Sequence, residues 1–213
     1  MKIVLLGNDE AKDELLSGLN NDTVTVIAVK DIDDFLLYPE ADAFFDLAFE
    51  MNTVRIELLK KLIPKLVFIN SISYTISETG SSFIRLNGWP TFLKRDLLEA
   101  ACSDDSSKTK VEQVMVALNK KIEWVPDIAG FISARIVSMI INEAWFALEE
   151  EVSTKKEIDT AMKLGTNYPY GPFEWGEKIG AKNICELLTV LSKTNNHYQP
   201  AVLLQKEASV KCH

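Results

Sequence analysis

The hydrophobic period of the sequence changes near its middle, and this change is the strongest constraint on the fold. In the first half, short apolar runs such as KIVLLG and KLVFINS alternate with amphipathic stretches such as VRIELLKKLI. That alternation is typical of a parallel sheet whose strands are joined by crossover helices. We therefore expect an α/β domain over residues 1–126.

The second half has the apolar spacing of helices instead. Helices are predicted over Phe131–Glu150, Lys155–Leu164 and Asn183–Lys193. Between the last two lies GTNYPYGPFEWGEKIG, residues 165–180, which its glycines and prolines predict to be a loop whose aromatic residues pack in a core or an interface. We therefore expect an all-α domain over residues 127–213, packed without a flexible linker because no glycine- and serine-rich stretch precedes it.

Composition excludes several classes of partner. The formal net charge is −8, and a nucleic-acid partner is not expected because phosphate binding needs a concentrated basic surface. The three cysteines, Cys102, Cys185 and Cys212, are widely spaced, which fits a reducing, cytoplasmic location better than a disulfide framework. The most apolar segment, residues 128–148, contains Arg135, which is costly in lipid, so no membrane span is expected.

Histidine is too scarce for the commonest kinds of catalytic centre. The sequence has two histidines, His197 and His213, both near its C-terminal end. A metal centre or a nucleophilic triad needs histidine close to other ligands or to a nucleophile, so neither is expected. His197 lies in the polar stretch KTNNHYQP, which is typical of a surface position.

The first predicted strand ends in a glycine that precedes a helix, where a dinucleotide-binding turn would lie. Such a turn has the pattern G-x-G-x-x-G, which lets the pyrophosphate approach the helix N-terminus. Here Gly7 is present, but Asp9 and Lys12 hold the other two positions. Asp31, at the end of the second strand, stands where an acidic residue would bind a ribose hydroxyl, although DIDD also suits a solvated helix start. An α/β domain of this type that binds no cofactor therefore remains an alternative interpretation.

The second half also carries a family signature. DIAGFISAR and EIDTAMKLGTNYPYGPFE resemble the D-x-P-G-F-x-x-N-R and E-D-I-D-x-A-M-x-x-G-x-x-x-P-x-G-P-F-E patterns of the C-terminal domain of 3-hydroxyacyl-CoA dehydrogenases. ADAFFDLAFE and VFINSIS resemble a strand and a turn of the family's N-terminal domain. The resemblance implies a Rossmann-like N-terminal domain followed by a helical domain that dimerises and borders an acyl-CoA cleft.

The resemblance also implies a reaction and its residues. The family oxidises 3-hydroxyacyl-CoA with NAD in fatty acid metabolism; a histidine removes the hydroxyl proton and a glutamate orients that histidine. Along FIRLNGWPTFLKRDLLEAA, Glu99 aligns with the glutamate and Asn87 with the histidine. The family serine that contacts substrate aligns with Ile72, and a slip of one residue brings in Ser73 or Ser71 instead.

The cofactor residues implied by the resemblance are Gly7, Asp31 and Glu50, the last of which ends ADAFFDLAFE. Because the glycine pattern is reduced to one residue, weak NAD binding is expected. The acyl-CoA is the expected small-molecule partner.

The substitution at the histidine position leaves two functions open. An amide cannot accept a proton at neutral pH, so Asn87 predicts weak or lost catalysis, and as part of an Asn-Gly pair it suits a turn. Glu99 then suits a solvent-facing strand position. Either the chain is an oxidoreductase in which Glu99 and a neighbouring serine have reduced roles, or it is a non-catalytic acyl-CoA-binding or dimeric scaffold protein. A third possibility is that His197 or a partner subunit supplies the missing base. The long apolar helix at residues 131–148 favours a homodimer.

Overall fold

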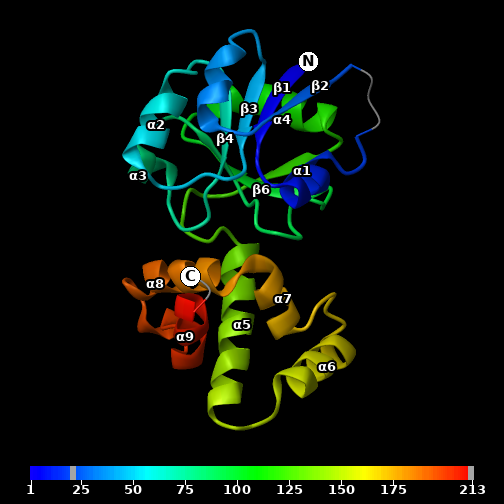
Figure 1. Ribbon diagram of the computed structural model, residues 1–213, viewed down its shortest axis with the longest axis vertical. Helices are drawn as coiled ribbons and strands as arrows, with labels where there is room; N and C mark the ends of the chain where they lie inside the picture. Colours follow the sequence, from blue (N-terminus) through cyan, green and yellow to red (C-terminus); the bar gives the residue numbers. More distant parts are fainter. Residues whose placement is uncertain (20–22, 211–213) are drawn as a thin grey trace. The chain divides into compact units, whose positions relative to one another are not determined.

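The computed structural model describes residues 1–19 and 23–210 (Figure 1). Cys212 and His213 lie outside the described residues. The chain divides into two compact units, Met1–Phe131 and Ile132–His213. The first is an α/β unit and the second is helical, so the expected fold class is confirmed.

The first unit is built on a sheet of seven strands within the described residues, in the order β2-β1-β3-β4-β5-β6-β7. Strands β1 to β5 run parallel, β6 pairs antiparallel with β5, and β7 pairs parallel with β6. The strands are β1 (Lys2–Leu6), β2 (Thr25–Val29), β3 (Ala43–Asp46), β4 (Leu66–Asn70), β5 (Ile84–Leu86), β6 (Leu97–Ala101) and β7 (Lys121–Trp124). Because β2 and β3 lie on opposite sides of β1, the strand order reverses there. The carboxyl ends of β1 and β3 therefore form the edge at which open α/β sheets bind ligands.

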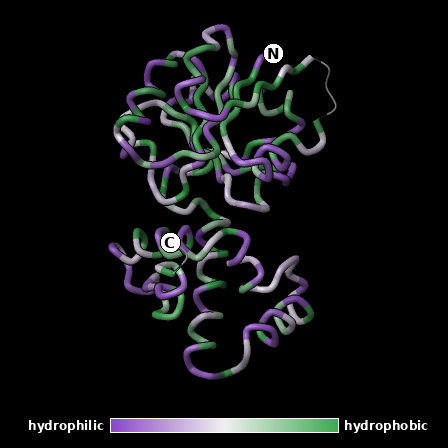
Figure 2. The backbone as a smooth tube through the Cα atoms, viewed as in Figure 1, coloured by the Kyte–Doolittle hydropathy of each residue, from purple (hydrophilic) through white to green (hydrophobic). Residues whose placement is uncertain are grey.

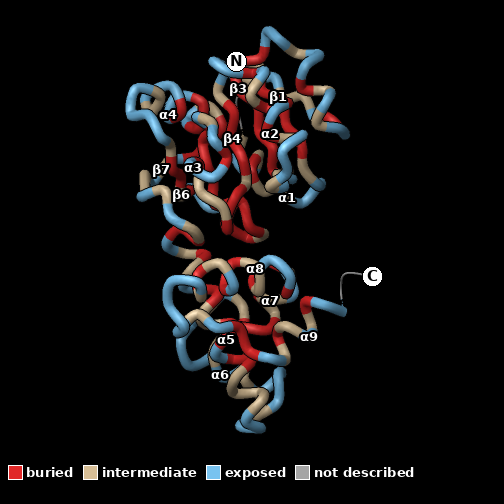
Figure 3. Tube along the Cα trace, turned by 90° about the vertical axis from the view of Figure 1, so that its left-hand side faces the viewer, coloured by how far each residue is buried: buried red, intermediate tan, exposed pale blue. Residues whose placement is uncertain are grey.

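Both faces of this sheet are covered. The helical segments are α1 (Asp9–Leu16), η1 (Ile32–Leu37), α2 (Thr53–Lys60), α3 (Ile76–Thr79), η2 (Asp105–Ser107) and α4 (Lys108–Ala117). One core contains Phe45 stacked on Phe68, with ring centroids 4.2 Å apart, and includes residues of α1 and α4. The other core contains Phe44 against Phe35, with residues of η1 and α2. Successive residues of β3 thus enter opposite cores, which explains why the strand is buried throughout and apolar up to its last residue, Asp46 (Figures 2 and 3).

The second unit is arranged around one long helix. Its helical segments are α5 (Ser133–Glu149), α6 (Lys155–Thr166), α7 (Pro172–Ile179), α8 (Ala181–Ser192), η3 (Asn196–Tyr198) and α9 (Val202–Val210). Ile141 and Trp145, one turn apart on α5, are buried. Beside them, Asn142 Nδ2 donates to Gln199 O and Asn142 Oδ1 accepts from Ala201 N, both at 2.9 Å, which anchors the segment that leads into α9. No helix of the described ranges is long and apolar enough to cross a bilayer.

One expectation for this unit is wrong. Part of the predicted loop at residues 165–180 is helix α7, and the last helix, α9, is not anticipated by the sequence pattern. The residues that favour a loop have helix-end roles here: Gly171 is the N-cap, Pro172 lies in the first turn, and Gly180, with φ of 93°, ends the helix. Glu174 completes the start of α7, because its Oε2 accepts from Gly171 N at 3.0 Å.

Candidate functional site

Asn87 and Glu99 lie opposite each other where β5 pairs with β6. Asn87 N donates to Glu99 O at 3.1 Å, and Asn87 Nδ2 donates to Glu99 Oε2 at 2.8 Å. Asn87 is only 2% exposed and continues the strand ladder, so its expected turn position is wrong. Glu99 is half-buried and hydrogen-bonded rather than solvent-facing. The two residues therefore form a pair in which an amide donates to a carboxylate, and only the carboxylate can accept a further proton.

A cation lies close to this pair. The Arg95 guanidinium lies over the Phe92 ring, with Cζ 4.1 Å from the ring centroid. Burial lowers the pKa of Arg95, while the carboxylates of Glu99 and Glu14 act in the opposite direction. Glu14, on α1, also accepts from Thr91 N at 2.7 Å. The loop after β5 is thus tied to α1 and holds a positive charge near Glu99.

The candidate serines lie in the loop after β4. Ser71 and Ser73 are 3% and 7% exposed, and Ser71 Oγ donates to Tyr74 O at 2.9 Å. The loop backbone is held by Arg85, whose Nε donates to Ser71 O at 2.9 Å and whose Nη2 donates to Ile72 O at 3.2 Å. Ser73 is therefore part of a loop with little local freedom.

Arg85 is a residue that the sequence reasoning missed. It is fully buried, its Nη1 pairs with Asp127, and its Nη2 donates to Ile128 O at 3.4 Å. The Phe131 ring lies 4.5 Å from its Cζ. Burial lowers the pKa of Arg85, and hydrogen bonding to Asp127 opposes this. A charged residue inside the apolar run SFIRLNGW was the available signal, because a buried guanidinium needs a carboxylate partner.

The three residues implied for the cofactor all follow strand ends on the same edge of the sheet. Asp31 precedes η1, and its N donates to Asp34 Oδ2 at 3.4 Å, so it begins a helical turn. Glu50 is exposed in the segment after β3, near the ion pair of Asp46 and Arg55. Burial raises the pKa of Asp46, and the negative charge of Glu50 adds a minor effect in the same direction.

Gly7 begins the turn that a dinucleotide would need. Its successor Asn8 caps α1, since Asn8 Oδ1 accepts from Ala11 N at 2.8 Å. Asp9 and Glu10 occupy the first turn of the helix. A diphosphate needs unengaged N–H groups and positive potential at that position. The residues present therefore do not fit the diphosphate of NAD.

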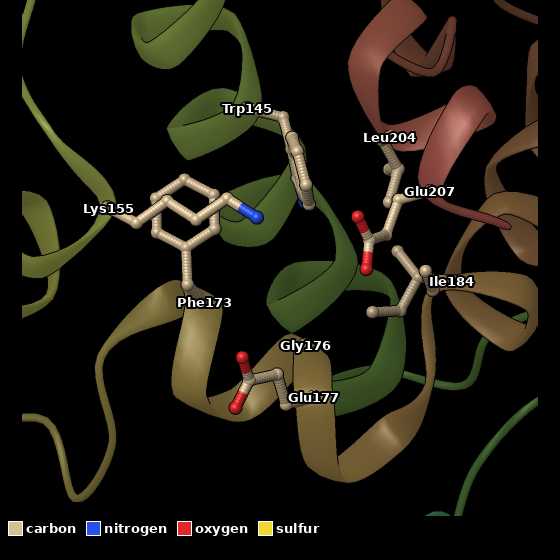
Figure 4. Close-up of a pocket in the computed structure, with 9 residues that line it drawn as sticks. Trp145, Lys155, Phe173, Gly176, Glu177, Ile184, Leu204 and Glu207 are labelled. Atoms are coloured by element: carbon tan, nitrogen blue, oxygen red, sulfur yellow. The ribbon is translucent and has the colours of Figure 1, made fainter. Parts of the chain in front are cut away.

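A separate small hollow, with a cavity volume of about 20 Å³, lies within the second unit (Figure 4). Trp145 and Phe173 form its aromatic wall, and Lys155 Nζ lies 4.3 Å from the centroid of Trp145 and 5.4 Å from that of Phe173. The carboxylates of Glu177 and Glu207 lie on the other side. The Lys155 side chain covers the rings, so Phe173 has a packing role there. His197 is exposed on η3 of the same unit.

Residues 130–211 match the family model described as 3-hydroxyacyl-CoA dehydrogenase, C-terminal domain. Over 111 residues the chain is 40% identical to a 3-hydroxyadipyl-CoA dehydrogenase of Escherichia coli, a match that covers 51% of this chain and 23% of that protein. Over 214 residues it is 27% identical to a 3-hydroxybutyryl-CoA dehydrogenase of Bradyrhizobium diazoefficiens, covering 93% of this chain and 70% of that one. The chain thus spans less than a quarter of the first relative.

Solved structures share the fold. The (S)-3-hydroxybutyryl-CoA dehydrogenase of Ralstonia eutropha superposes with a TM-score of 0.77 at 21% identity, covering 99% of this chain and 94% of that one. FadB2 of M. tuberculosis gives 0.80 at 14% identity, covering 98% and 93%. The fold is that of a two-domain protein with an α/β unit followed by a helical unit. The C-terminal sequence and the fold of the chain are thus similar to those of 3-hydroxyacyl-CoA dehydrogenases, as the sequence resemblance predicts.

Proposed function

We propose that this chain binds 3-hydroxyacyl- or 3-ketoacyl-CoA thioesters and that the dehydrogenase step of its family is lost or very slow in it. The observation that carries the proposal is the hydrogen bond of 2.8 Å from Asn87 Nδ2 to Glu99 Oε2. The contact between a base and its orienting carboxylate is retained, but the group in the position of the base is an amide. Loss of a general base alone slows a reaction by typically 10²- to 10⁴-fold.

The chain's own residues have defined parts in this proposal. Ser73, in the loop fixed by Arg85, donates a hydrogen bond to a carbonyl oxygen of the acyl thioester. The Asn87–Glu99 pair lies at the end of β5 and orients the oxygen at the third carbon of the acyl chain. No hydride step is assigned to the chain, because the turn after β1 does not fit the diphosphate of NAD.

The proposal is tested by titrating the protein with acetoacetyl-CoA in a calorimeter and then by following NADH absorbance with excess acetoacetyl-CoA. We expect saturable binding of acetoacetyl-CoA, weaker binding of free CoA, and no NADH consumption above background. Ser73→Ala should weaken acetoacetyl-CoA binding more than free CoA binding, whereas Ser81→Ala, an exchange outside the loop, should leave both unchanged. Absence of acetoacetyl-CoA binding would overturn the proposal.

Catalysis by the natural protein would point to a base supplied from elsewhere. If NADH is consumed, His197→Ala distinguishes the two sources left open by the sequence: abolished turnover assigns the base to His197, and unchanged turnover excludes it. Asn87→His tests the pair itself. Its imidazole can donate one N–H to Glu99 and accept a proton at the other nitrogen, so any turnover gained by Asn87→His should be lost again in Asn87→His/Glu99→Gln.

Self-association through the helical unit is the second part of the proposal. It is supported by apolar side chains exposed one turn apart at the start of α5, where Ile132 is 53% and Ile136 is 55% exposed. A dimeric acyl-CoA-binding scaffold would use the same surface without catalysis. Light scattering should give the mass of a dimer, and a monomer at high protein concentration would contradict this part. A cytoplasmic location remains a prediction from cysteine usage.

A further inference from the structure

The side chain that precedes α1 already accepts a hydrogen bond from the N-terminal end of this helix. The first N–H groups of a helix have no partner within the helix and are the groups that bind phosphate oxygens. Here Ala11 N donates to Asn8 Oδ1 at 2.8 Å, and Lys12 N makes the regular helical bond to Asn8 O at 3.1 Å. Asn8 thus occupies, with its own amide oxygen, a position that a phosphate oxygen would take.

The positive end of the helix dipole already interacts with carboxylates of the chain itself. Asp9 and Glu10 stand in the first turn, where carboxylates interact favourably with the helix dipole. The nearest cation of the turn, Lys12, is 3.5 Å from Asp9 as an ion pair. A dinucleotide diphosphate would place further negative charge next to these two carboxylates, which is unfavourable. The basic side chain of the turn, Lys12, is already paired with Asp9.

The remaining glycine has a reason for its presence that involves no ligand. A Cβ added at Gly7 would lie 3.0 Å from Leu47 Cβ. Leu47 is held there because its N donates to Leu6 O at 2.8 Å, which continues the pairing of β1 with β3. Gly7 is therefore favoured by the close approach of two strand ends.

The segment after β2, where a ribose would bind, is acidic as well. Asp31 begins η1, and Asp33 and Asp34 follow it in the first turn. Three carboxylates in four residues suit a solvated helix start, and Asp31 N is already bonded to Asp34 Oδ2.

We infer that the turn from Gly7 to Lys12 is a self-contained helix cap that excludes a dinucleotide diphosphate, so that the chain holds neither NAD nor NADH there. The inference goes beyond the proposed function and does not depend on acyl-CoA binding. The α/β unit keeps the architecture of a nicotinamide-binding domain, but the Asn8 side chain occupies its phosphate position. The carboxylates of Asp9 and Glu10 repel the diphosphate.

The test is a titration with NADH, followed by NADH fluorescence and by calorimetry. The natural protein should give no saturation at millimolar NADH. Asp9→Gly/Glu10→Gln removes both carboxylates and restores one glycine of the pattern, and its association constant for NADH should rise at least tenfold. Glu123→Gln/Glu150→Gln changes the net charge equally at two exposed positions that are not part of the turn and should give no rise.

Three results would overturn the inference: micromolar NADH binding by the natural protein, an unchanged association constant in the folded turn variant, or an equal rise in the control variant. Circular dichroism identifies a turn variant that has not folded, and Asp9→Asn/Glu10→Gln, which adds no glycine, then replaces it in the same titration. Acetoacetyl-CoA titrated into the same samples keeps the two proposals apart, because its failure to bind would contradict only the proposed function.

Discussion

Two glycine-containing segments of the molecule match the same family in opposite ways. Residues 165–180 keep the family pattern almost completely, whereas the turn at residues 7–12 keeps a single glycine. In the first segment the retained residues have partners inside the helical unit; in the second the replaced positions are on an exposed helix end. The difference indicates that a motif is retained when the fold itself requires it and can drift when only a ligand does.

The contact that makes residues 165–180 indispensable runs between two helices. Asp159 of α6 accepts from Phe173 N at 2.8 Å with Oδ1 and from Glu174 N at 3.2 Å with Oδ2. It is only 8% exposed, and it caps α7 from outside. An added Cβ at Gly171 would collide with the Asp159 carboxyl group. The glycine and the aspartate therefore require each other.

The largest effect is expected from Gly171→Ala. The new methyl group displaces the Asp159 carboxylate and breaks its hydrogen bonds to α7, so the free energy of unfolding should fall by about 3 kcal/mol. Denaturant unfolding measures this. Gly165→Ala is the matched control: nothing lies within 4 Å of a Cβ there, and alanine should stabilise α6 by roughly 0.5 kcal/mol. An equal loss of unfolding free energy in the two variants would show that the effect at Gly171 does not come from its contact with Asp159.

Asp159→Ala should destabilise the helical unit by about 2 kcal/mol, because two N–H groups at the start of α7 lose a charged acceptor. The same substitution makes room for a side chain at Gly171. In the Asp159→Ala background, Gly171→Ala should therefore cost much less than it does alone. Denaturant unfolding of the four proteins of this cycle gives the coupling, and additive effects would show that the two residues act independently.

A smaller effect is expected in the other segment. Asn8→Ala removes the side-chain cap of α1 and should lower the free energy of unfolding by about 1 kcal/mol. Asn52 is the corresponding cap of α2, since its Oδ1 accepts from Arg55 N at 3.1 Å. Asn52→Ala should therefore lower the free energy of unfolding by a similar amount. Thermal unfolding compares the two. A stability loss at Asn52 alone would mean that Asn8 is not a structural cap.

The smallest effect concerns pH. Hydrogen bonding to Lys163 and to Gly171 N lowers the pKa of Glu174, and Ser153 and Thr154 lower the pKa of Glu157 in the same way. A lowered folded pKa contributes stability that is present above the ordinary glutamate value of about 4.3 and is lost as the pH falls through the folded value. Glu157→Gln/Glu174→Gln should therefore lose less stability than the natural protein on acidification below that pH. Parallel losses in denaturant midpoint would contradict this.

The order of strands and long helices could be predicted from the sequence because each has a clear apolar period. Helix α7 could not, since Gly171 and Pro172 favour a loop until their places at a helix start are known. The role of Asp159 depends on a contact with residues more than ten positions further along the chain, which no local pattern contains.

The candidate pair was predictable only through resemblance. Local reasoning favours a turn at Asn87, because Asn-Gly is a turn dipeptide, whereas the antiparallel pairing of β5 with β6 places it opposite Glu99. The three-dimensional pairing overrides the local preference. Arg85 was missed because its partners lie on a segment far along the chain.

The buried guanidinium of Arg85 determines where the α/β half can be separated from the rest. Its acceptors Asp127 and Ile128 follow the last strand of the sheet, and the ring of Phe131 lies against it. A fragment that stops at residue 126 would contain every strand of the described sheet and yet leave a charged side chain inside without its counter-ion. The isolated half, if produced by itself, should therefore extend to Phe131, since the residues that complete its interior come after its last strand.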